Sequence, residues 1–196
     1  MVNSVFFAWQ LDTKADDNKS FIWDSIKSAC AELQNEISPE LSPRPEKDTE
    51  GVSGSPNIIQ TIFRKIDECS IFIADVTFIA KTDSNKYIPN PNVLLELGYA
   101  VRTIGWERTV LVLNRAFGKT DKLPFDMLQH RWPIEYCITP QTQVRKKRYE
   151  SLTAALTEAF KSCQETSLKR AEEMMLSLDT ETLSVGVTPK NCTIVN

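Results

Sequence analysis

Short apolar runs alternate along this chain with longer segments of helical periodicity, and that alternation limits the possible folds more than any other feature. Residues 5–9 (VFFAW), 70–76 (SIFIADV) and 109–113 (TVLVL) are apolar almost throughout, as expected of strands that are covered on both faces. The segments between them repeat apolar residues every three or four positions. Strands that alternate with helices predict an α/β domain, with an open parallel sheet and helices on both faces.

The helices between these strands have recognisable starts. Asp17 or Asn18 is the expected N-cap of the first helix, whose apolar stripe is Phe21, Ile22, Ile26, Cys30, Leu33 and Ile37. A second helix is expected after the turn GVSGSPN, with Ser55 as its N-cap and Pro56 at its first position. A third helix is expected over residues 92–103.

The remaining segments set the domain boundary. Residues 38–50 contain three prolines and are expected to form a short edge strand and a long loop, and residues 77–90 a polar loop. A last helix is expected around the stripe Tyr149, Leu152, Leu156, Phe160 and Cys163. Because the pattern weakens beyond about Gln164, we expect a domain over residues 1–165, followed over residues 166–196 by a helical extension, a tail, a linker or the start of a second domain.

Composition excludes several classes of function. The net charge is −3 and the one basic run is RKKR at residues 145–148, which argues against a nucleic-acid binder. His130 is the single histidine, and the five cysteines are scattered without a CxxC pair, so neither a metal site nor a disulfide framework is expected. No apolar run approaches the roughly 18 to 20 residues that span a bilayer. We therefore expect a cytoplasmic protein that binds no metal and no membrane.

Polar residues gather where the expected strands end. Ligands of open parallel sheets bind beyond the carboxyl ends of the strands, at the point where the strand order reverses. Hydroxyl and amide groups there suit a ribose, and the turn GVSGS is either a phosphate site at a helix start or an ordinary glycine turn. The residues expected to bind substrate at this edge are Trp9, Gln10, Asp12, Asp48, Ser53, Ser55, Asp75, Asn90, Asn92, Tyr99 and Asn114.

Glu96 is the most informative of the charged residues. It stands within the apolar stretch NPNVLLELGYA, residues 90–100, in about the first two turns of the expected helix. The positive end of the helix dipole stabilises an acid at such a position, whether the acid faces solvent or a ligand. Asn92 lies beside it on the same helix face, and Asp75 ends the neighbouring strand. These neighbours favour a carboxylate that points toward the ligand cleft.

SIFIADVT, NPNVLLELGYA and RTVLVLN followed by LPFD together resemble the bacterial TIR-like (Toll/interleukin-1-receptor-like) nucleotide-binding domains, and the likeness extends over residues 5–160. The glutamate followed by Leu-Gly-Tyr-Ala is also similar to that of the nucleoside 2-deoxyribosyltransferases. Those transferases have a Gly-Thr-Ala-Phe-like stretch before the glutamate, whereas this chain has Asn92-Val93-Leu94-Leu95. Plant and animal TIR enzymes lack the Gly-Tyr-Ala sequel. The resemblance implies a flavodoxin-like or TIR-like fold.

Both families cleave an N-glycosidic bond with a glutamate, so the resemblance implies a catalytic role for Glu96. For a TIR-like enzyme it implies an NAD glycohydrolase that releases nicotinamide and needs NAD as substrate but no cofactor. It also implies an anti-phage defence effector or signal generator that is activated by assembly, as a homo-oligomer or with a sensor partner. The alternatives are a nucleoside 2-deoxyribosyltransferase or nucleoside hydrolase, and a non-catalytic module that binds a nucleotide signal or another TIR-like domain. Trp9 or Tyr99 would either stack on the adenine or nicotinamide or belong to the core, as an aromatic residue after a buried strand usually does.

Overall fold

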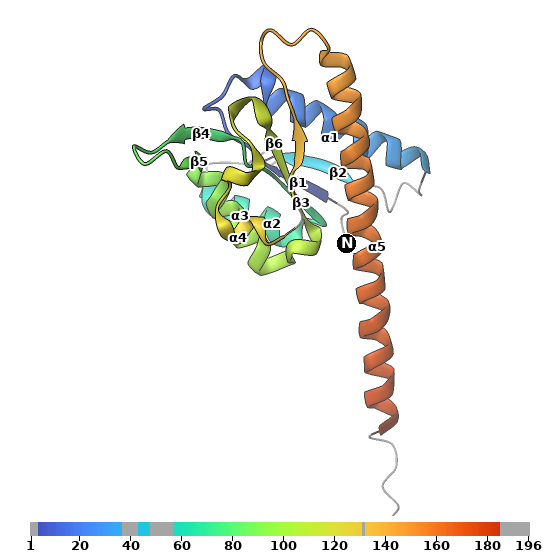
Figure 1. Ribbon diagram of the computed structural model, residues 1–196. Coiled ribbons are helices and arrows are strands. Elements are labelled where there is room, and N and C mark those ends of the chain that lie inside the picture. Colours follow the sequence, from blue (N-terminus) through green and yellow to red (C-terminus); the bar gives the residue numbers. More distant parts are fainter. Residues whose placement is uncertain (1–3, 37–42, 48–56, 131, 185–196) are drawn as a thin grey trace, which may run out of the picture.

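A five-stranded parallel sheet forms the centre of the protein, in the order β2-β1-β3-β6-β7 (Figure 1). The computed structural model describes residues 4–36, 43–47, 57–130 and 132–184. The strands of the sheet are β1 (Ser4–Ala8), β2 (Arg44–Lys47), β3 (Ile71–Asp75), β6 (Thr109–Asn114) and β7 (Ile134–Tyr136). The predicted α/β class is confirmed, and this strand order is the flavodoxin-like one.

The central strands are apolar because both faces of the sheet are covered. Every residue of β1 and of β3 is buried. Alternate residues of β1 face opposite sides, so that Val5 and Phe7 belong to one hydrophobic core while Phe6 and Ala8 belong to the other. β1 pairs with β2 on one side and β3 on the other, with Phe6 opposite both Glu46 and Phe72.

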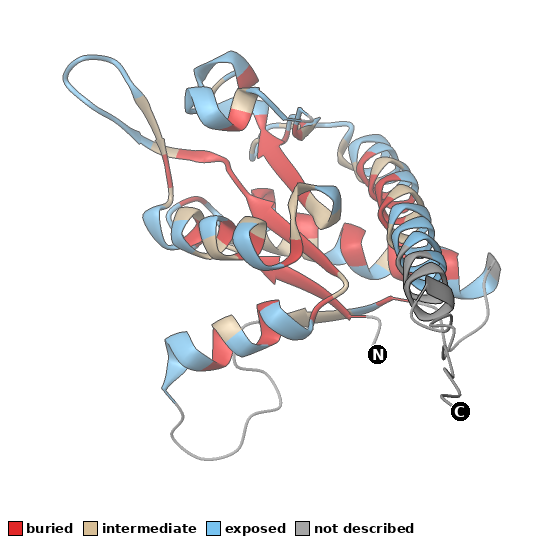
Figure 2. Ribbon diagram, turned by 90° about the horizontal axis from the view of Figure 1, so that it is seen from below, coloured by how far each residue is buried: buried red, intermediate tan, exposed pale blue. Residues whose placement is uncertain are grey.

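Helices pack in two layers, and Figure 2 shows their buried faces turned toward the sheet. One face carries α1 (Lys19–Glu36) and α5 (Arg145–Ser184), whose apolar residues join Val5 and Phe7 in one core. The other face carries α2 (Ile58–Glu68), α3 (Pro91–Ile104) and the short α4 (Phe125–Leu128). Short 3₁₀ turns connect them: η1 (Ala15–Asp17), η2 (Trp106–Arg108), η3 (Arg115–Phe117) and η4 (Thr120–Lys122).

The connection from β3 to α3 is a hairpin rather than the polar loop that the sequence predicts. Its antiparallel strands are β4 (Phe78–Lys81) and β5 (Tyr87–Pro89). Apolar and aromatic residues at both ends favour strand pairing, and Asn85 takes the left-handed conformation with φ of 61° in the turn. The hairpin ends at Pro89, so that only Asn90 separates it from Pro91, the first residue of α3.

The second helix begins later than predicted. Its N-cap is Asn57, whose side-chain oxygen accepts a hydrogen bond from the backbone N–H of Gln60. The predicted cap, Ser55, and Pro56 lie outside the described residues. The prediction of a short edge strand before this helix is confirmed, because β2 pairs only with β1 among the described strands.

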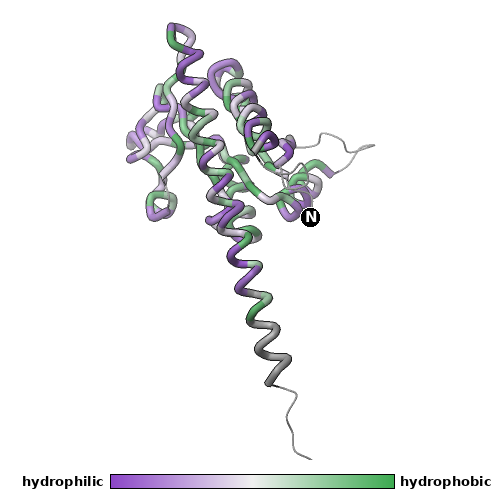
Figure 3. The backbone as a smooth tube through the Cα atoms, turned by 90° about the vertical axis from the view of Figure 1, so that its right-hand side faces the viewer, coloured by the Kyte–Doolittle hydropathy of each residue, from purple (hydrophilic) through white to green (hydrophobic). Residues whose placement is uncertain are grey.

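The last helix is longer than its apolar stripe. α5 has 40 residues, and its first half packs on α1 through Leu152, Leu156, Phe160 and neighbouring side chains. Leu168, Met175 and Leu176 are 57%, 70% and 67% exposed, and Figure 3 shows mixed hydropathy along the part of the helix that projects from the domain. None of the helices in the described ranges is long and apolar enough to cross a membrane.

Candidate functional site

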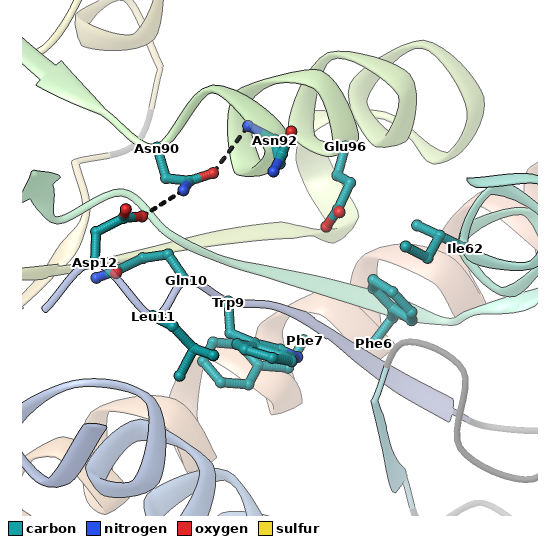
Figure 4. A pocket seen from close by; sticks show the side chains of 10 residues that line it. All are labelled: Phe6, Phe7, Trp9, Gln10, Leu11, Asp12, Ile62, Asn90, Asn92 and Glu96. Atoms are coloured by element: carbon teal, nitrogen blue, oxygen red, sulfur yellow. Dashed lines mark hydrogen bonds between the residues drawn. The ribbon is translucent and has the colours of Figure 1, made fainter. Parts of the chain in front are cut away.

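A cleft of about 360 Å³ lies at the carboxyl end of β1, between that strand, α2 and α3 (Figure 4). This is the point where the strand order reverses, because β1 leads to β2 on one side and has β3 on the other. A cleft therefore lies at the edge of the sheet where the sequence pattern predicts ligand binding. Its lining is Phe6, Phe7, Trp9, Gln10, Leu11, Asp12, Ile62, Asn90, Asn92 and Glu96.

The first turns of α3 form the polar wall. Asn92 and Glu96 are four residues apart and share the helix face that lines the cleft. Glu96 is half-buried, and Val93, Leu97 and Ala100 on the adjoining face anchor the helix in the core. The apolar residues around Glu96 thus form the buried face of the helix. The Glu96 carboxylate lies at the edge of that face and points into the cleft.

Asn90 fixes where this wall begins. Its side-chain oxygen accepts hydrogen bonds from the backbone N–H groups of Asn92 (2.8 Å) and Val93 (3.1 Å), which is an N-cap. Its side-chain amide donates to Asp12 Oδ2 at 2.6 Å (Figure 4). Since Asp12 belongs to the loop after β1, this bond joins the two walls of the cleft.

The opposite wall consists of β1 and the loop after it, which adds the apolar side chains Trp9 and Leu11 to the polar Gln10 and Asp12. Trp9 lines the cleft and also packs against the α1–α5 core, and the ammonium of Lys19 lies 3.2 Å from the centroid of its ring. Leu11 is 63% exposed at the mouth of the cleft. Figure 4 shows both side chains on the side of β1 that is turned away from Glu96, so they lie at the rim of the cleft and not directly opposite the carboxylate.

A buried polar network anchors the loop after β1 to the end of the neighbouring strand β3. Asp75, at the end of β3, is fully buried, and its carboxylate accepts hydrogen bonds from Gln10 Nε2, Asn18 Nδ2 and the backbone N–H of Thr77. Gln10 is further bonded to the backbone and hydroxyl of Thr13. Burial raises the pKa of the Asp75 carboxyl above its ordinary value, and these hydrogen bonds oppose the rise.

The network continues to the far edge of the sheet through Asn114, at the end of β6. Its amide donates to Asn18 Oδ1 and to the carbonyls of Asp17 and Ile138. Tyr136 also donates to the Asp17 carbonyl, and burial, followed by the charges of Asp75 and Asp17, raises the pKa of its hydroxyl well above the ordinary value. The phenol therefore stays protonated and remains a donor at neutral pH.

The predicted site residues consequently divide into groups. Those that line the cleft are Trp9, Gln10, Asp12, Asn90, Asn92 and Glu96. Asp75 and Asn114 support the cleft from the buried network. Tyr99 stacks on Phe63 with 4.1 Å between ring centroids and donates to Asp67, so it joins α3 to α2. Asp48, Ser53 and Ser55 lie outside the described residues.

The apolar part of the lining and the residues that support the cleft could not be recognised as site residues from the sequence. Phe6 and Phe7 read only as strand core, and Ile62 only as the buried stripe of α2. Arg145 read as a solvated residue of a basic run, yet its guanidinium pairs with the buried Asp17 carboxylate at 2.7 Å. Asn18, expected as a helix cap, directs its side chain to Asp75 and Asn114. Its position between acidic residues and an apolar stripe was the available signal.

The chemistry available in the cleft is that of two carboxylates. Asp12 and Glu96 are the only ionisable side chains among the described residues that line it. In the same described part of the chain, no group of three or more His, Cys, Asp or Glu residues could hold a metal ion. Carboxylates in a cleft attract a positively charged group or stabilise positive charge that develops during a reaction.

Compared with models of known protein families and with curated protein sequences, the chain matches none of them. The assignment of function therefore rests on the residues of the cleft, together with the motif resemblance.

Proposed function

We propose that this protein is an NAD glycohydrolase of the TIR-like class, which cleaves the bond between nicotinamide and ribose. The observation that carries the proposal is the position of Glu96, a half-buried carboxylate in a cleft at the reversal point of a flavodoxin-like sheet. NPNVLLELGYA, which provides this glutamate, is also the motif that resembles the TIR-like domains.

The chemistry of the leaving group supports this substrate. The nicotinamide ring of NAD is a cation, so it takes the electron pair of the breaking C–N bond and departs as a neutral base. The positive charge passes to the ribose as an oxocarbenium ion, and Glu96 either stabilises that charge or attacks the anomeric carbon. Water then completes the hydrolysis and releases a proton.

The small number of ionisable groups among the described lining residues supports the same choice. A neutral nucleoside must protonate its base as the bond breaks, and enzymes supply that proton from an acid such as histidine or a protonated carboxyl. Among the described lining residues only Asp12 and Glu96 ionise, and Asp12 already accepts a short hydrogen bond from Asn90. A leaving group that needs no proton fits such a cleft better.

The remaining lining residues have roles that follow from their chemistry. Asn92 presents an amide beside Glu96 that suits a ribose hydroxyl, and Trp9 presents a ring that suits a base. The resemblance further suggests activation by assembly and a role in defence against phage, in the cytoplasm.

A nucleoside 2-deoxyribosyltransferase is the second candidate, and the size of the cleft favours it. A volume of about 360 Å³ lies near the lower end of the range for small-molecule sites, roughly 300–1,000 Å³, and suits a nucleoside. Its reaction would exchange the base of a deoxynucleoside for a free base and leave NAD intact.

One experiment distinguishes the two candidate functions. The protein, at high concentration, is incubated in parallel with NAD and with a deoxynucleoside plus a second free base, and products are followed by mass spectrometry. We expect nicotinamide release from NAD and no base exchange. Exchange without consumption of NAD would replace the first function by the second, and turnover of neither substrate would favour a binding module.

A further inference from the structure

We propose that Asp12 and Asn90 form a clasp that positions the cleft walls, and that neither residue binds substrate directly. The Asn90 side chain makes hydrogen bonds through both its oxygen and its nitrogen. Its oxygen caps α3 by accepting from the N–H groups of Asn92 and Val93, and this fixes the orientation of the amide plane. The amide nitrogen is thereby aimed at Asp12 Oδ2, 2.6 Å away.

The clasp connects the parts of the molecule that a ligand would have to touch at the same time. Asp12 and Asn90 are 78 residues apart in the sequence, one in the loop after β1 and the other at the start of the helix that carries Glu96. That loop is already held at its base, where Gln10 donates to the buried Asp75. Farther along the loop, Thr13 is bonded to Gln10, and Asp12 accepts the hydrogen bond that reaches across the cleft from Asn90.

Asparagine is the residue type that such a clasp requires at position 90. An aspartate there would cap the helix equally well, because capping uses an acceptor oxygen. It would have no donor for Asp12, however, and two carboxylates would face each other across the cleft mouth. Position 90 therefore separates the capping role from the clasp role, which allows a clean test.

The clasp acts on catalysis through distance, and this part of the inference rests on the proposed function. Glu96 is carried by α3, whereas Trp9 and Leu11 belong to the opposite wall. If the walls move apart, the sugar and the carboxylate lose their alignment, and a misplacement of about 1 Å can lower a rate by roughly a hundred-fold. Loss of the clasp should therefore lower kcat more than it raises KM.

The test is a reciprocal exchange in the full chain, with Asn90→Asp, Asp12→Asn and the double variant. Asn90→Asp opposes two acids and should lower kcat by at least about ten-fold. Asp12→Asn retains an acceptor for Asn90 and should have a smaller effect. The double variant places a donor at 12 and an acceptor at 90, so the bond forms in the reverse direction and kcat should return to within about three-fold of wild type.

Hydrogen–deuterium exchange of residues 9–13 and 91–94 gives a readout that does not depend on turnover. Faster exchange at residues 9–13 in Asn90→Asp, with 91–94 unchanged and the double variant restored, would support the clasp even if NAD were not the substrate. Equal exchange in all four proteins would overturn it. Restored exchange in the double variant with a KM that stays raised would show instead that Asp12 binds the substrate itself.

Discussion

At the scale of single residues, the structure separates acids that the sequence presents alike. Asp75 and Glu96 both stand beside apolar runs near the ends of elements, and both were predicted to serve the site. Glu96 lines the cleft at the edge of the buried face of α3. Asp75 is fully buried and accepts hydrogen bonds from Gln10, Asn18 and Thr77. Sequence shows where an acid is placed along an element, but the partners of Asp75 come from segments up to 65 residues away.

Asp75→Asn should destabilise the protein because the new amide nitrogen faces a donor in either orientation: Gln10 and Asn18 in one, the backbone N–H of Thr77 in the other. A buried polar group left unsatisfied costs about 1 to 3 kcal/mol, and urea unfolding at pH 7 would measure the loss. An unfolding free energy equal to that of wild type would contradict the role given to this carboxylate.

The difference in unfolding free energy between wild type and Asp75→Asn should depend on pH. Burial raises the pKa of the Asp75 carboxyl in the folded state, so its contribution to stability is complete below the unfolded-state pKa and is lost as the pH rises through the folded-state pKa. The unfolding free energy of wild type minus that of Asp75→Asn should therefore be larger at pH 4.5 than at pH 7.5. A difference that grows toward pH 7.5 would mean that the hydrogen bonds outweigh desolvation.

At the scale of elements, the β4–β5 hairpin determines how α3 begins, and it depends on a close approach at Gly118. This glycine follows η3 and has φ of 154°, and a Cβ there would lie 2.5 Å from Cδ2 of Phe78 and 2.9 Å from Cε1 of Tyr87. The loop after β6 therefore packs directly on the hairpin that leads to Asn90.

Gly118→Ala should push the hairpin away and cost about 1 to 3 kcal/mol, the usual range for overpacking. Gly98→Ala is the matched control, because a Cβ at this exposed position of α3 meets nothing within 4 Å and alanine favours a helix by about 0.5 to 1 kcal/mol. Urea unfolding of both variants should give changes of opposite sign. A neutral Gly118→Ala would show that the hairpin is not held there.

At the scale of the whole molecule, the parallel strands and the helices that pack on them could largely be predicted from the sequence. The hairpin, the buried polar network and the full length of α5 could not. Apolar runs such as SIFIADV identify parallel strands because they are buried on both faces, a property that local sequence carries. The hairpin after Val76 and the network around Asn114 depend on contacts between distant segments. For α5, the apolar stripe ends near Cys163 while the helix continues to Ser184, since helix formation needs no continued packing once a packed part has nucleated it.

Shortening the chain after Ser167 should therefore leave the domain stable. The side chains of Leu168, Met175 and Leu176 are exposed, and the Arg170–Glu107 pair, 3.9 Å apart on the surface, contributes little. We expect the unfolding free energy to change by less than about 0.5 kcal/mol. By contrast, Leu156→Ala, in the packed half, should cost about 2 to 5 kcal/mol. A similar loss on shortening would place the far half of α5 within the domain.

The central claim is that Glu96 acts on an N-glycosidic bond of NAD, and nicotinamide release by Glu96→Gln tests it most directly. The measurement compares wild type, Glu96→Gln and Glu173→Gln, the last an exposed glutamate on α5 far along the chain from the cleft. All three should unfold at similar urea concentrations. We predict that Glu96→Gln loses at least about a hundred-fold in rate while Glu173→Gln retains the wild-type rate. Equal nicotinamide release by wild type and a folded Glu96→Gln would contradict the account.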